Sequence, residues 1–326
     1  MPKSSATAVA HPNIALIKYW GKREQASNLP AVGSLSITLD ALRTRTTVSF
    51  DRRLEADQLI LNGAAAPAEQ SRLISCLNAL RALAGSRDSA LVESANDFPT
   101  GAGLASSASG YAALAVAGAA ALGLDPADPR LEEVARIGSG SAPRSLFGGF
   151  VLLNNTPSGT HCSCLQPPED WPLQVVVAVT SEAGKAVSSR DGMTDSQRTS
   201  PYYPNWVDTH EADLSQAQAF IAQRDFVGLA ELAEHNCLKM HAVMLTTRPA
   251  LMYWSPVTLA CMHKVQELRA AGVPVFFTID AGPQLKAVCL PEAADTVAAA
   301  LAAVPGVLRL IPGGLGHGAR VIATDG

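Results

Sequence analysis

Two parts of the chain gather residue types that can bind an anion or remove a proton. The first, NDFPTGAGLASSASG, runs from residue 96 to residue 110 and holds three glycines and three serines directly before an alanine-rich run. Glycine lets a ligand approach the main chain closely, and the first turn of a helix presents unpaired N–H groups and a positive dipole end. The stretch therefore predicts a phosphate cradle at a helix that begins near Ser106.

We expect this cradle to bind a nucleotide through Ser94, Gly101, Gly103, Leu104, Ala105, Ser106, Ser107 and Ser109. It is not the Walker pattern, because no Gly-Lys-Ser/Thr follows the glycines. The alternative is an ordinary capped helix after a glycine turn, and the local sequence favours the two roughly equally.

The second part is the apolar run VPVFFTI, which ends at Asp280 and is followed by Ala281-Gly282-Pro283. A carboxylate at the tip of a strand with a tight turn behind it is mounted rigidly enough to remove a proton. The alternative is an aspartate that caps a turn before Gly-Pro. On local sequence alone, that alternative is favoured by roughly three to one.

Cationic residues occur in two further motifs. Lys18 and Lys22 flank YWG, and in an extended stretch they share one face while Tyr19 lies on the other. Arg144 lies in GSGSAPRS, and its guanidinium suits a carboxylate because it offers two parallel hydrogen bonds. The alternatives are a solvated pair of lysines and an exposed arginine after a helix C-terminus.

The elements that must position these residues alternate between β and α patterns. Runs rich in β-branched residues predict strands at 6–20, 33–50, 89–97, 147–154, 173–180, 273–280, 285–290 and 306–311. Helical spacing predicts helices at 71–85, 106–122, 128–141, 211–225, 226–244, 257–272 and 292–304. The polar stretch 181–208 lacks periodicity and predicts a functional loop. We therefore expect an α+β protein with two lobes, residues 1–182 and 183–326.

Composition excludes several classes of partner. The chain has 326 residues, a net charge of -4 and 48% hydrophobic residues, which argues against nucleic acid or an anionic membrane as the main partner. The longest apolar run, near residues 112–124, is shorter than the roughly 18 residues of a membrane span. The six cysteines form neither a disulfide framework nor a zinc ligand set. We expect a cytoplasmic protein without a signal peptide.

Four motifs together resemble one enzyme family. Pro99-x-x-x-Gly103-Leu104-x-Ser106-Ser107-Ala108 resembles the phosphate-binding motif of the GHMP kinase superfamily. NIALIKYWGKR, GSGSAPRSLFGGF and FTIDAGPQ are similar, in order and spacing, to signatures of its mevalonate diphosphate decarboxylases. Weaker similarity at SSRDGM and TSPYYPNWV extends the match across nearly the whole chain. The resemblance implies a GHMP kinase-like fold with an N-terminal α/β domain and a C-terminal α+β domain.

The resemblance also implies a reaction, in which 5-diphosphomevalonate and ATP give isopentenyl diphosphate, CO2, ADP and phosphate. Phosphorylation turns the C3 hydroxyl into a leaving group, and the electrons of the C–CO2 bond then form the alkene. The implied cofactors are ATP and Mg2+, with Ser107 as a contact of the metal. The implied assembly is a homodimer that binds small molecules.

Residue roles follow from the same resemblance. Asp280 is the implied base, Lys18 lies beside it, and Arg144 holds the substrate carboxylate. The implied substrate contacts are Tyr19, Lys22, Ser139, Ser141, Arg144, Ser189, Arg190 and Met193. Pro143 departs from the family, in which a small polar residue or cysteine is usual, and it removes one backbone N–H.

Three other functions remain open at this point. The first is decarboxylation of 5-phosphomevalonate, which differs by a single phosphate. The second is a GHMP-type kinase that phosphorylates mevalonate without decarboxylation, although such a kinase has no need for an arginine on the carboxylate. The third is a non-catalytic sensor of a nucleotide or metabolite, which the joint presence of Asp280, Lys18 and Arg144 disfavours.

Overall fold

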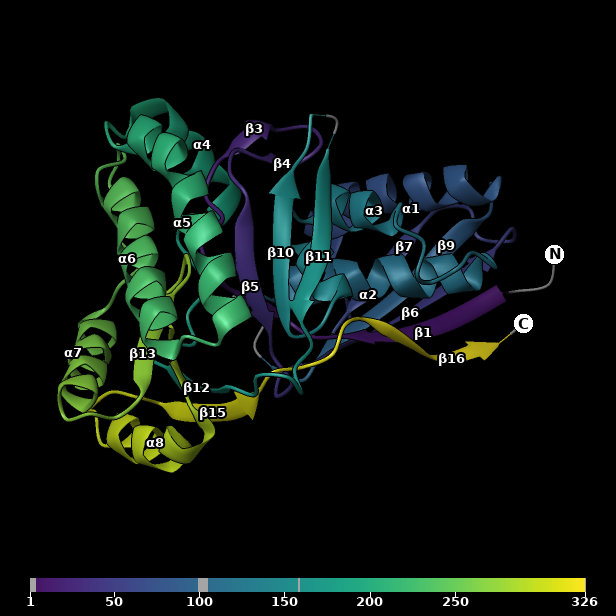
Figure 1. Cartoon of the computed structure of the whole chain (residues 1–326). Helices are drawn as coiled ribbons and strands as arrows, with labels where there is room; N and C mark the ends of the chain where they lie inside the picture. Colours follow the sequence, from purple (N-terminus) through teal and green to yellow (C-terminus); the bar gives the residue numbers. More distant parts are fainter. Residues whose placement is uncertain (1–3, 99–104, 158, 326) are drawn as a thin grey trace.

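The computed structural model describes residues 4–98, 105–157 and 159–325. Its largest sheet has the strand order β16-β1-β6-β9-β7-β8. These strands are β1 (Ser4–Ala10), β6 (Thr44–Asp51), β7 (Gln58–Leu61), β8 (Ala64–Ala65), β9 (Ser89–Asn96) and β16 (Arg320–Asp325). Helix α2 (Ser106–Ala121) packs on β1 and β6, and α1 (Gln70–Ala84) and α3 (Leu131–Gly138) pack beside it (Figure 1).

Two further four-stranded sheets carry most of the remaining strands. One has the order β11-β10-β5-β2, with β2 (Asn13–Ile17), β5 (Ser34–Thr38), β10 (Phe150–Asn155) and β11 (Thr160–Gln166). The other has the order β13-β14-β12-β15, with β12 (Gln174–Val179), β13 (Val275–Ile279), β14 (Leu285–Cys289) and β15 (Arg309–Gly314). A short ribbon pairs β3 (Lys22–Glu24) with β4 (Leu29–Pro30).

Helices from the second half of the chain surround the β13–β15 sheet on the left of Figure 1. They are α4 (Ser189–Thr199), α5 (Tyr203–Gln223), α6 (Phe226–Leu245), α7 (Pro256–Ala270) and α8 (Ala294–Ala302). Three 3-10 turns complete the described elements, namely η1 (Pro67–Glu69), η2 (Ala142–Leu146) and η3 (Pro291–Ala293). The α+β class expected from the sequence is confirmed.

Most of the expected elements lie within a few residues of their predicted positions. Helix α1 ends at Gly85, whose φ of +67° is the left-handed conformation that suits glycine. Helix α2 is buried on nearly every side, as its apolar faces require. Its small side chains also allow close packing, because a Cβ on Gly118 would lie 2.5 Å from Leu80.

The loop expected at 181–208 is wrong in its second half. This stretch contains α4 and the start of α5. The Ser188 hydroxyl caps α4 by accepting a hydrogen bond from the N–H of Asp191. The helix is short and strongly polar, so its period does not stand out in the sequence.

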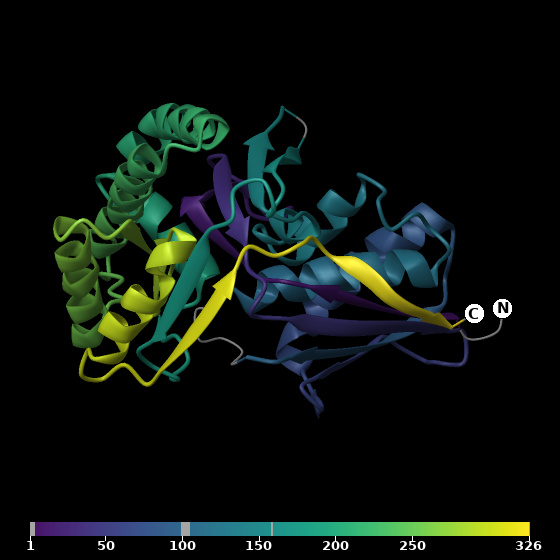
Figure 2. The ribbon, with the colours of Figure 1, turned by 60° about the horizontal axis from the view of Figure 1, so that its bottom comes forward.

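Strand pairing runs across residue 182, the expected boundary between the two lobes. Strand β12 precedes that position but pairs with β14 and β15 from the end of the chain. Strand β16 pairs antiparallel with β1. Figure 2 shows this last segment, in yellow, running from the β15 sheet to the β1 sheet.

The GGLGHG segment at 313–318, which leads from β15 to β16, is packed between other strands. The N–H of Gly149 donates to the carbonyl of Gly316, and the N–H of Gly316 donates to the carbonyl of Thr38. A Cβ at Gly318 would lie 2.3 Å from the carbonyl oxygen of Leu146, so the close approach requires glycine. The segment therefore connects two strands and also holds two sheets together.

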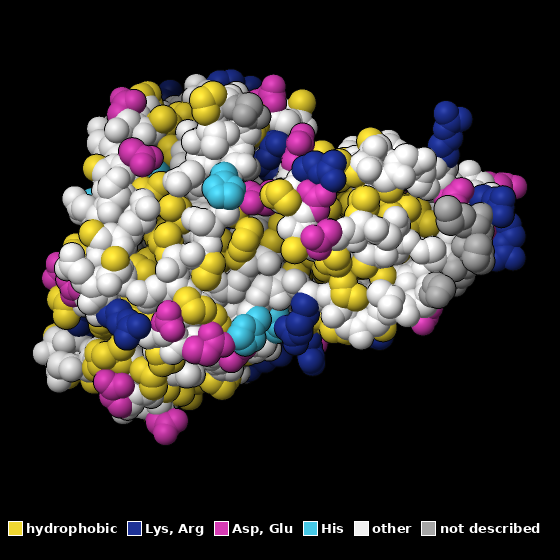
Figure 3. All heavy atoms as spheres, turned by 45° about the vertical axis from the view of Figure 1, so that its right-hand side comes forward, with side chains coloured by type: hydrophobic (Ala, Val, Ile, Leu, Met, Phe, Trp, Pro, Cys, Tyr) yellow, Lys and Arg dark blue, Asp and Glu magenta, His cyan; other side chains and the backbone are white. Residues whose placement is uncertain are grey.

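The surface carries mixed charge. Acidic and basic side chains are interspersed on the face drawn in Figure 3. Among the described helices, none combines the length and the apolar character that crossing a membrane requires.

Candidate active site

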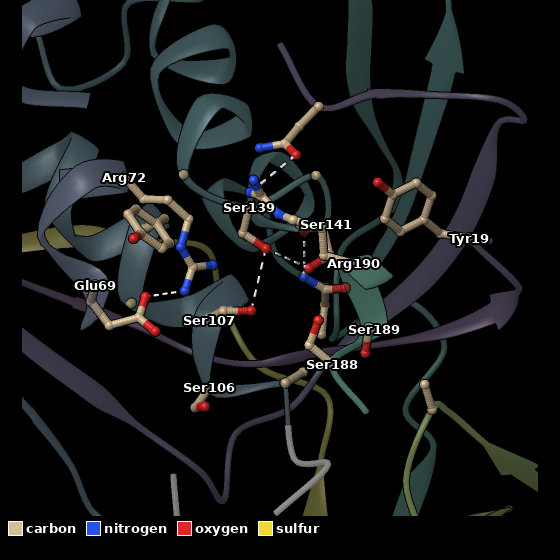
Figure 4. Close-up of a pocket in the computed structure, with 18 of the residues that line it drawn as sticks. Tyr19, Glu69, Arg72, Ser106, Ser107, Ser139, Ser141, Ser188, Ser189 and Arg190 are labelled. Atoms are coloured by element: carbon tan, nitrogen blue, oxygen red, sulfur yellow. Dashed lines mark hydrogen bonds and ion pairs between the residues drawn. The ribbon is translucent and has the colours of Figure 1, made fainter. Parts of the chain in front are cut away.

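A cavity of about 820 Å³ brings together side chains that are far apart in the sequence. Its wall combines the start of α2, residues 138–144, residues 18–22, the start of α4 and Asp280. Figure 4 shows serine hydroxyls from three of these segments turned toward one another. The cavity therefore contains both of the regions from which the sequence analysis began.

Asp280 follows β13 directly and reaches the cavity wall between two ammonium groups. Its Oδ1 lies 2.7 Å from Nζ of Lys18, and its Oδ2 lies 3.1 Å from Nζ of Lys286. The lysine side chains are 1% and 2% exposed, whereas that of Asp280 is 27% exposed. Burial alone raises the pKa of the Asp280 carboxyl, but the two ammonium groups outweigh burial and hold that pKa well below its ordinary value. The carboxylate is thus anionic and fixed in place.

Arg144 lies on η2 and is held by neutral partners. Its Nε donates to Oδ1 of Asn13 at 3.0 Å, and its Nη1 donates to the hydroxyl of Ser34. Burial lowers the pKa of its guanidinium, although arginine keeps its charge in proteins. Because neither Asn13 nor Ser34 is anionic, Arg144 presents an uncompensated positive charge to the cavity it lines.

Pro143 occupies the first turn of η2. A backbone N–H in the first turn of a helix has no partner within that helix, so proline is tolerated there. The departure from the family motif therefore removes no hydrogen bond from the helix itself.

The cradle begins at Ala105, a non-glycine residue with a φ of +55°. Ala105 has no side-chain oxygen that could cap α2, so the first N–H groups of the helix remain available to an anion. Ser106 and Ser107 line the cavity beside them, as does Ser94. Gly101, Gly103 and Leu104 lie outside the described residues.

A chain of hydroxyl groups connects the cradle to the loop after α3. The Oγ atoms of Ser107 and Ser139 are 3.3 Å apart, and those of Ser139 and Ser141 are 3.2 Å apart (Figure 4). These distances place the expected nucleotide and substrate contacts on one continuous wall.

Ser109 requires a correction. The sequence placed it among the nucleotide contacts, but its side chain is fully buried. Its hydroxyl lies 2.6 Å from that of Thr44 and bonds to the carbonyl of Ser106. Because α2 advances about 100° per residue, Ser109 lies about 200° around the helix from the exposed Ser107 and faces the sheet instead of the cavity.

Lys22 and Arg190 converge on Asn28 at another part of the wall. Nζ of Lys22 donates to Oδ1 of Asn28 at 2.6 Å, and Nη2 of Arg190 donates to the same oxygen at 3.4 Å. Burial, together with Arg190 and Arg72, lowers the pKa of Lys22 to about 8. A pair of cations around one neutral amide is suited to a multiply charged anion.

The other expected substrate contacts also line this cavity. The hydroxyl of Tyr19 is buried without a hydrogen-bond partner among the described residues. A Cβ at Gly140 would lie 2.3 Å from that hydroxyl, which explains the glycine there. Ser189 accepts a hydrogen bond from Nζ of Lys185 at 3.1 Å, and Met193 adds a buried apolar surface.

Several residues in the cavity wall or directly behind it were absent from the sequence-based prediction. Asn13 and Lys286 are polar residues in otherwise apolar, buried strands, which is the signal that could have found them. Lys185 lies in the loop before α4, and burial followed by the charge of Lys286 lowers its pKa to about 8. Arg72, which pairs with Glu69 and lies over the ring of Tyr111, had no motif around it.

The described residues contain no group of three or more His, Cys, Asp or Glu side chains that could hold a metal ion. The residues present do fit a cation that arrives with phosphates. The hydroxyl of Ser107 lies at the start of α2 on the cavity wall, and Mg2+ usually takes one or two protein oxygens while phosphates and water supply the rest.

Two family models together match most of the chain. A "Diphosphomevalonate decarboxylase-like N-terminal domain" matches residues 10–164, and a "Mevalonate 5-diphosphate decarboxylase C-terminal domain" matches residues 175–307. The human diphosphomevalonate decarboxylase is 38% identical to this chain over 93% of the chain and 80% of the human protein. The chain belongs to the diphosphomevalonate decarboxylase family.

Solved structures of the family share the same fold. The Staphylococcus aureus mevalonate diphosphate decarboxylase has a TM-score of 0.92 and 38% identity, covering 98% of both chains. A structure described as "MDDEF in complex with MVAPP, AMPPCP and Magnesium" has a TM-score of 0.90 and 41% identity, covering 98% of this chain and 99% of the other. The family expected from the four motifs is confirmed.

Proposed function

We propose that this protein catalyses the ATP-dependent decarboxylation of 5-diphosphomevalonate to isopentenyl diphosphate, with release of CO2, ADP and phosphate. The observation that carries the proposal is the single cavity lined by Asp280, Arg144 and the hydroxyl groups at the start of α2. One substrate needs all three, because its hydroxyl must be phosphorylated while its carboxylate is held. Family membership supports the same activity.

The charges suggest how the substrate lies. Its carboxylate binds the guanidinium of Arg144, and its C3 hydroxyl donates to the carboxylate of Asp280. Its diphosphate binds the part of the wall formed by Tyr19, Lys22, Ser139, Ser141, Ser189 and Arg190, with Met193 packed beside it. The nucleotide phosphates lie at Ser94, Ala105, Ser106 and Ser107.

In the first step, Asp280 orients the hydroxyl for attack on the terminal phosphoryl group. The C3–O–P bond forms as the bond to ADP breaks, and the hydroxyl proton passes toward the Asp280 carboxylate. A carboxylate with a strongly depressed pKa is a weak base, which is sufficient because phosphoryl transfer is loose and depends mainly on positioning. The ammonium of Lys18 offsets phosphoryl charge. A magnesium ion bound with the nucleotide, in contact with Ser107, would neutralise further phosphate charge.

In the second step, the C3–O bond breaks and phosphate departs. Arg144 keeps the substrate carboxylate oriented until this happens. The electron pair of the C–CO2 bond then forms the C=C bond, and CO2 leaves. Holding the carboxylate by its oxygens couples bond breaking at C3 to loss of CO2.

We also propose that the protein is a cytoplasmic homodimer. All six cysteines are free thiols, which supports a reducing compartment. The dimer is inferred from the family resemblance.

The direct test incubates the protein with ATP and Mg2+ and with mevalonate, its 5-phosphate or its 5-diphosphate in turn. We expect equal amounts of CO2 and ADP with the 5-diphosphate only. CO2 from the 5-phosphate would reassign the substrate. ADP without CO2 from mevalonate would make the protein a kinase, and no turnover with any of the three would contradict the proposal.

Ser107→Ala is expected to raise KM for ATP by about tenfold, since one hydrogen bond to a charged group is worth about 1.5–3 kcal/mol. Initial rates at varied ATP and Mg2+ measure the effect. Ser109→Ala is the matched control on the same helix, because its hydroxyl faces the sheet. Unchanged nucleotide kinetics in Ser107→Ala would limit this serine to a role in the helix.

Substrate binding is expected to weaken as pH rises above about 8. The pKa values of Lys22 and Lys185 both lie at about 8 in the ligand-free protein, so both side chains lose their charge above that pH. A neutral amine attracts an anion less, so KM should rise with pH while kcat changes less. KM measured from pH 6.5 to 9.5 tests this, and Lys22→Met should flatten the rise. A KM independent of pH would contradict it.

A further inference from the structure

Lys286 is a charged residue at a buried strand position where an apolar residue is expected. It lies on β14, an inner strand with β13 on one side and β12 on the other, and all five residues of β14 are buried. Its register partners are Thr278 on β13 and Val177 on β12. A buried ammonium is costly to desolvate and is retained only when something compensates it.

The compensation is the carboxylate of Asp280. Nζ of Lys286 lies 3.1 Å from Oδ2, whereas Nζ of Lys18 lies 2.7 Å from Oδ1. Lys18 is itself fixed by a second hydrogen bond, to the carbonyl of Ala15 at 2.8 Å. Each carboxylate oxygen thus has its own ammonium, and the plane of the carboxylate is defined by two anchors, one on β14 and one directly after β2.

The two lysines differ in their access to the cavity. Among the described residues, the cavity wall includes Lys18 and Asp280 but not Lys286. Lys286 therefore contacts the carboxylate from behind. A carboxylate oxygen has room for more than one hydrogen bond, so a hydroxyl from the cavity side can bond to Asp280 without displacing Lys286.

We infer that Lys286 is a positioning residue for the reaction: it holds Oδ2 of Asp280 from the sheet, so that the carboxylate meets the substrate hydroxyl in one fixed orientation. The inference rests on the proposed role of Asp280. Its second consequence is electrostatic, because two ammonium groups around one carboxylate leave a net positive charge beside the site of phosphoryl transfer. Burial and Lys286 together lower the pKa of Lys185, so the charge of Lys286 extends into the cavity.

The test compares Lys286→Met, which has a side chain of similar length without charge, with Arg81→Met. Arg81 forms another buried ion pair, 2.8 Å from Asp57, outside the cavity. Both variants should lose thermal stability. Only Lys286→Met should lose kcat, by about 10–100-fold, with KM for ATP and for the substrate changed less than threefold, because misplacement of a reacting group lowers turnover more than binding.

Chemical rescue separates this role from a structural one. Lys286→Ala leaves space for a small amine, so ethylammonium or propylammonium should restore kcat in a saturable manner, and propanol should not. If Lys286→Met does not fold, Lys286→Gln, which keeps a donor but not the charge, is used for the same comparison of kcat.

A folded, charge-free variant with the kcat of the wild type would overturn the inference, as would a loss that no amine restores. The wild-type assay with 5-diphosphomevalonate distinguishes this failure from failure of the proposed function. If the wild type releases CO2 and the variants are equally active, only the role of Lys286 is withdrawn.

Discussion

Replacing Asp280 by asparagine is expected to lower kcat by about 10²–10⁴-fold, the range that a positioned general base contributes. Asparagine keeps the size of the side chain, but it replaces one acceptor oxygen by an NH2 donor and cannot accept the hydroxyl proton. KM for ATP should not rise, because the substitution removes the negative charge beside Lys18 and Lys286, whose ammonium groups retain their attraction for phosphate. Single-turnover release of ADP and CO2, together with nucleotide binding by titration, measures the two effects separately.

A stability control is needed for this variant, since Asp280→Asn removes the anion that lies between two buried ammonium groups. Asp57→Asn breaks the buried pair with Arg81 away from the cavity and serves that purpose. We expect both variants to melt at lower temperature and only Asp280→Asn to lose turnover. If Asp280→Asn kept more than a tenth of the wild-type kcat, Asp280 would be removed as the base.

Replacing Arg144 by leucine is expected to lower kcat/KM by at least about 10²-fold. Loss of one partner from a buried, hydrogen-bonded charge pair costs about 2–5 kcal/mol, and here the partner is the substrate carboxylate. Leucine also leaves the hydrogen-bonding groups of Asn13 and Ser34, which now hold the guanidinium, without that partner. The loss should appear in both KM and kcat, because Arg144 must hold the substrate carboxylate until the C3–O bond breaks.

The ratio of the two products gives the more specific result for Arg144. If the carboxylate is held loosely, phosphoryl transfer can occur without decarboxylation, so CO2 released per ADP should fall below one in Arg144→Leu. Arg144→Lys keeps the charge but not the two parallel hydrogen bonds. We expect it to restore substrate affinity more than the ratio of CO2 to ADP. A CO2-to-ADP ratio of one at an undiminished rate would assign the carboxylate to another group.

The sequence located site residues more accurately where a motif lies at the end of a predicted strand or helix than where it does not. Asp280 follows a strongly apolar strand and Ser106 begins an apolar helix, so the local pattern located both ends, and the resemblance to the family motifs favoured a functional role over a turn or a cap. Ser109 shows the limit of such reasoning, because the Gly/Ser cluster gave no sign of which serine faces the sheet. Only the helical phase, set by where α2 begins, decides this.

Long-range pairing was beyond the reach of local patterns. Lys286 stands in LKAVCL, and its partner becomes evident only when β13 and β14 lie side by side. The sheet that β12 or β16 joins is set by partners far away in the sequence. The amino-acid composition of either strand does not distinguish that sheet from the other sheets. Helix α4 is stabilised by its Ser188 cap and by packing against α6. Its polar sequence alone therefore did not indicate a helix.

The central claim is that the carboxylate of Asp280 and the guanidinium of Arg144 act on opposite groups of a single substrate within reach of the nucleotide. The most direct measurement is a crystal structure of Asp280→Asn with ATP, Mg2+ and 5-diphosphomevalonate, since slow turnover should preserve the complex. The account predicts the C3 hydroxyl at residue 280, the carboxylate on Arg144, and the terminal phosphate between that hydroxyl and Ser107. A substrate whose carboxylate lies away from Arg144, or a nucleotide whose phosphates lie outside this cavity, would contradict it.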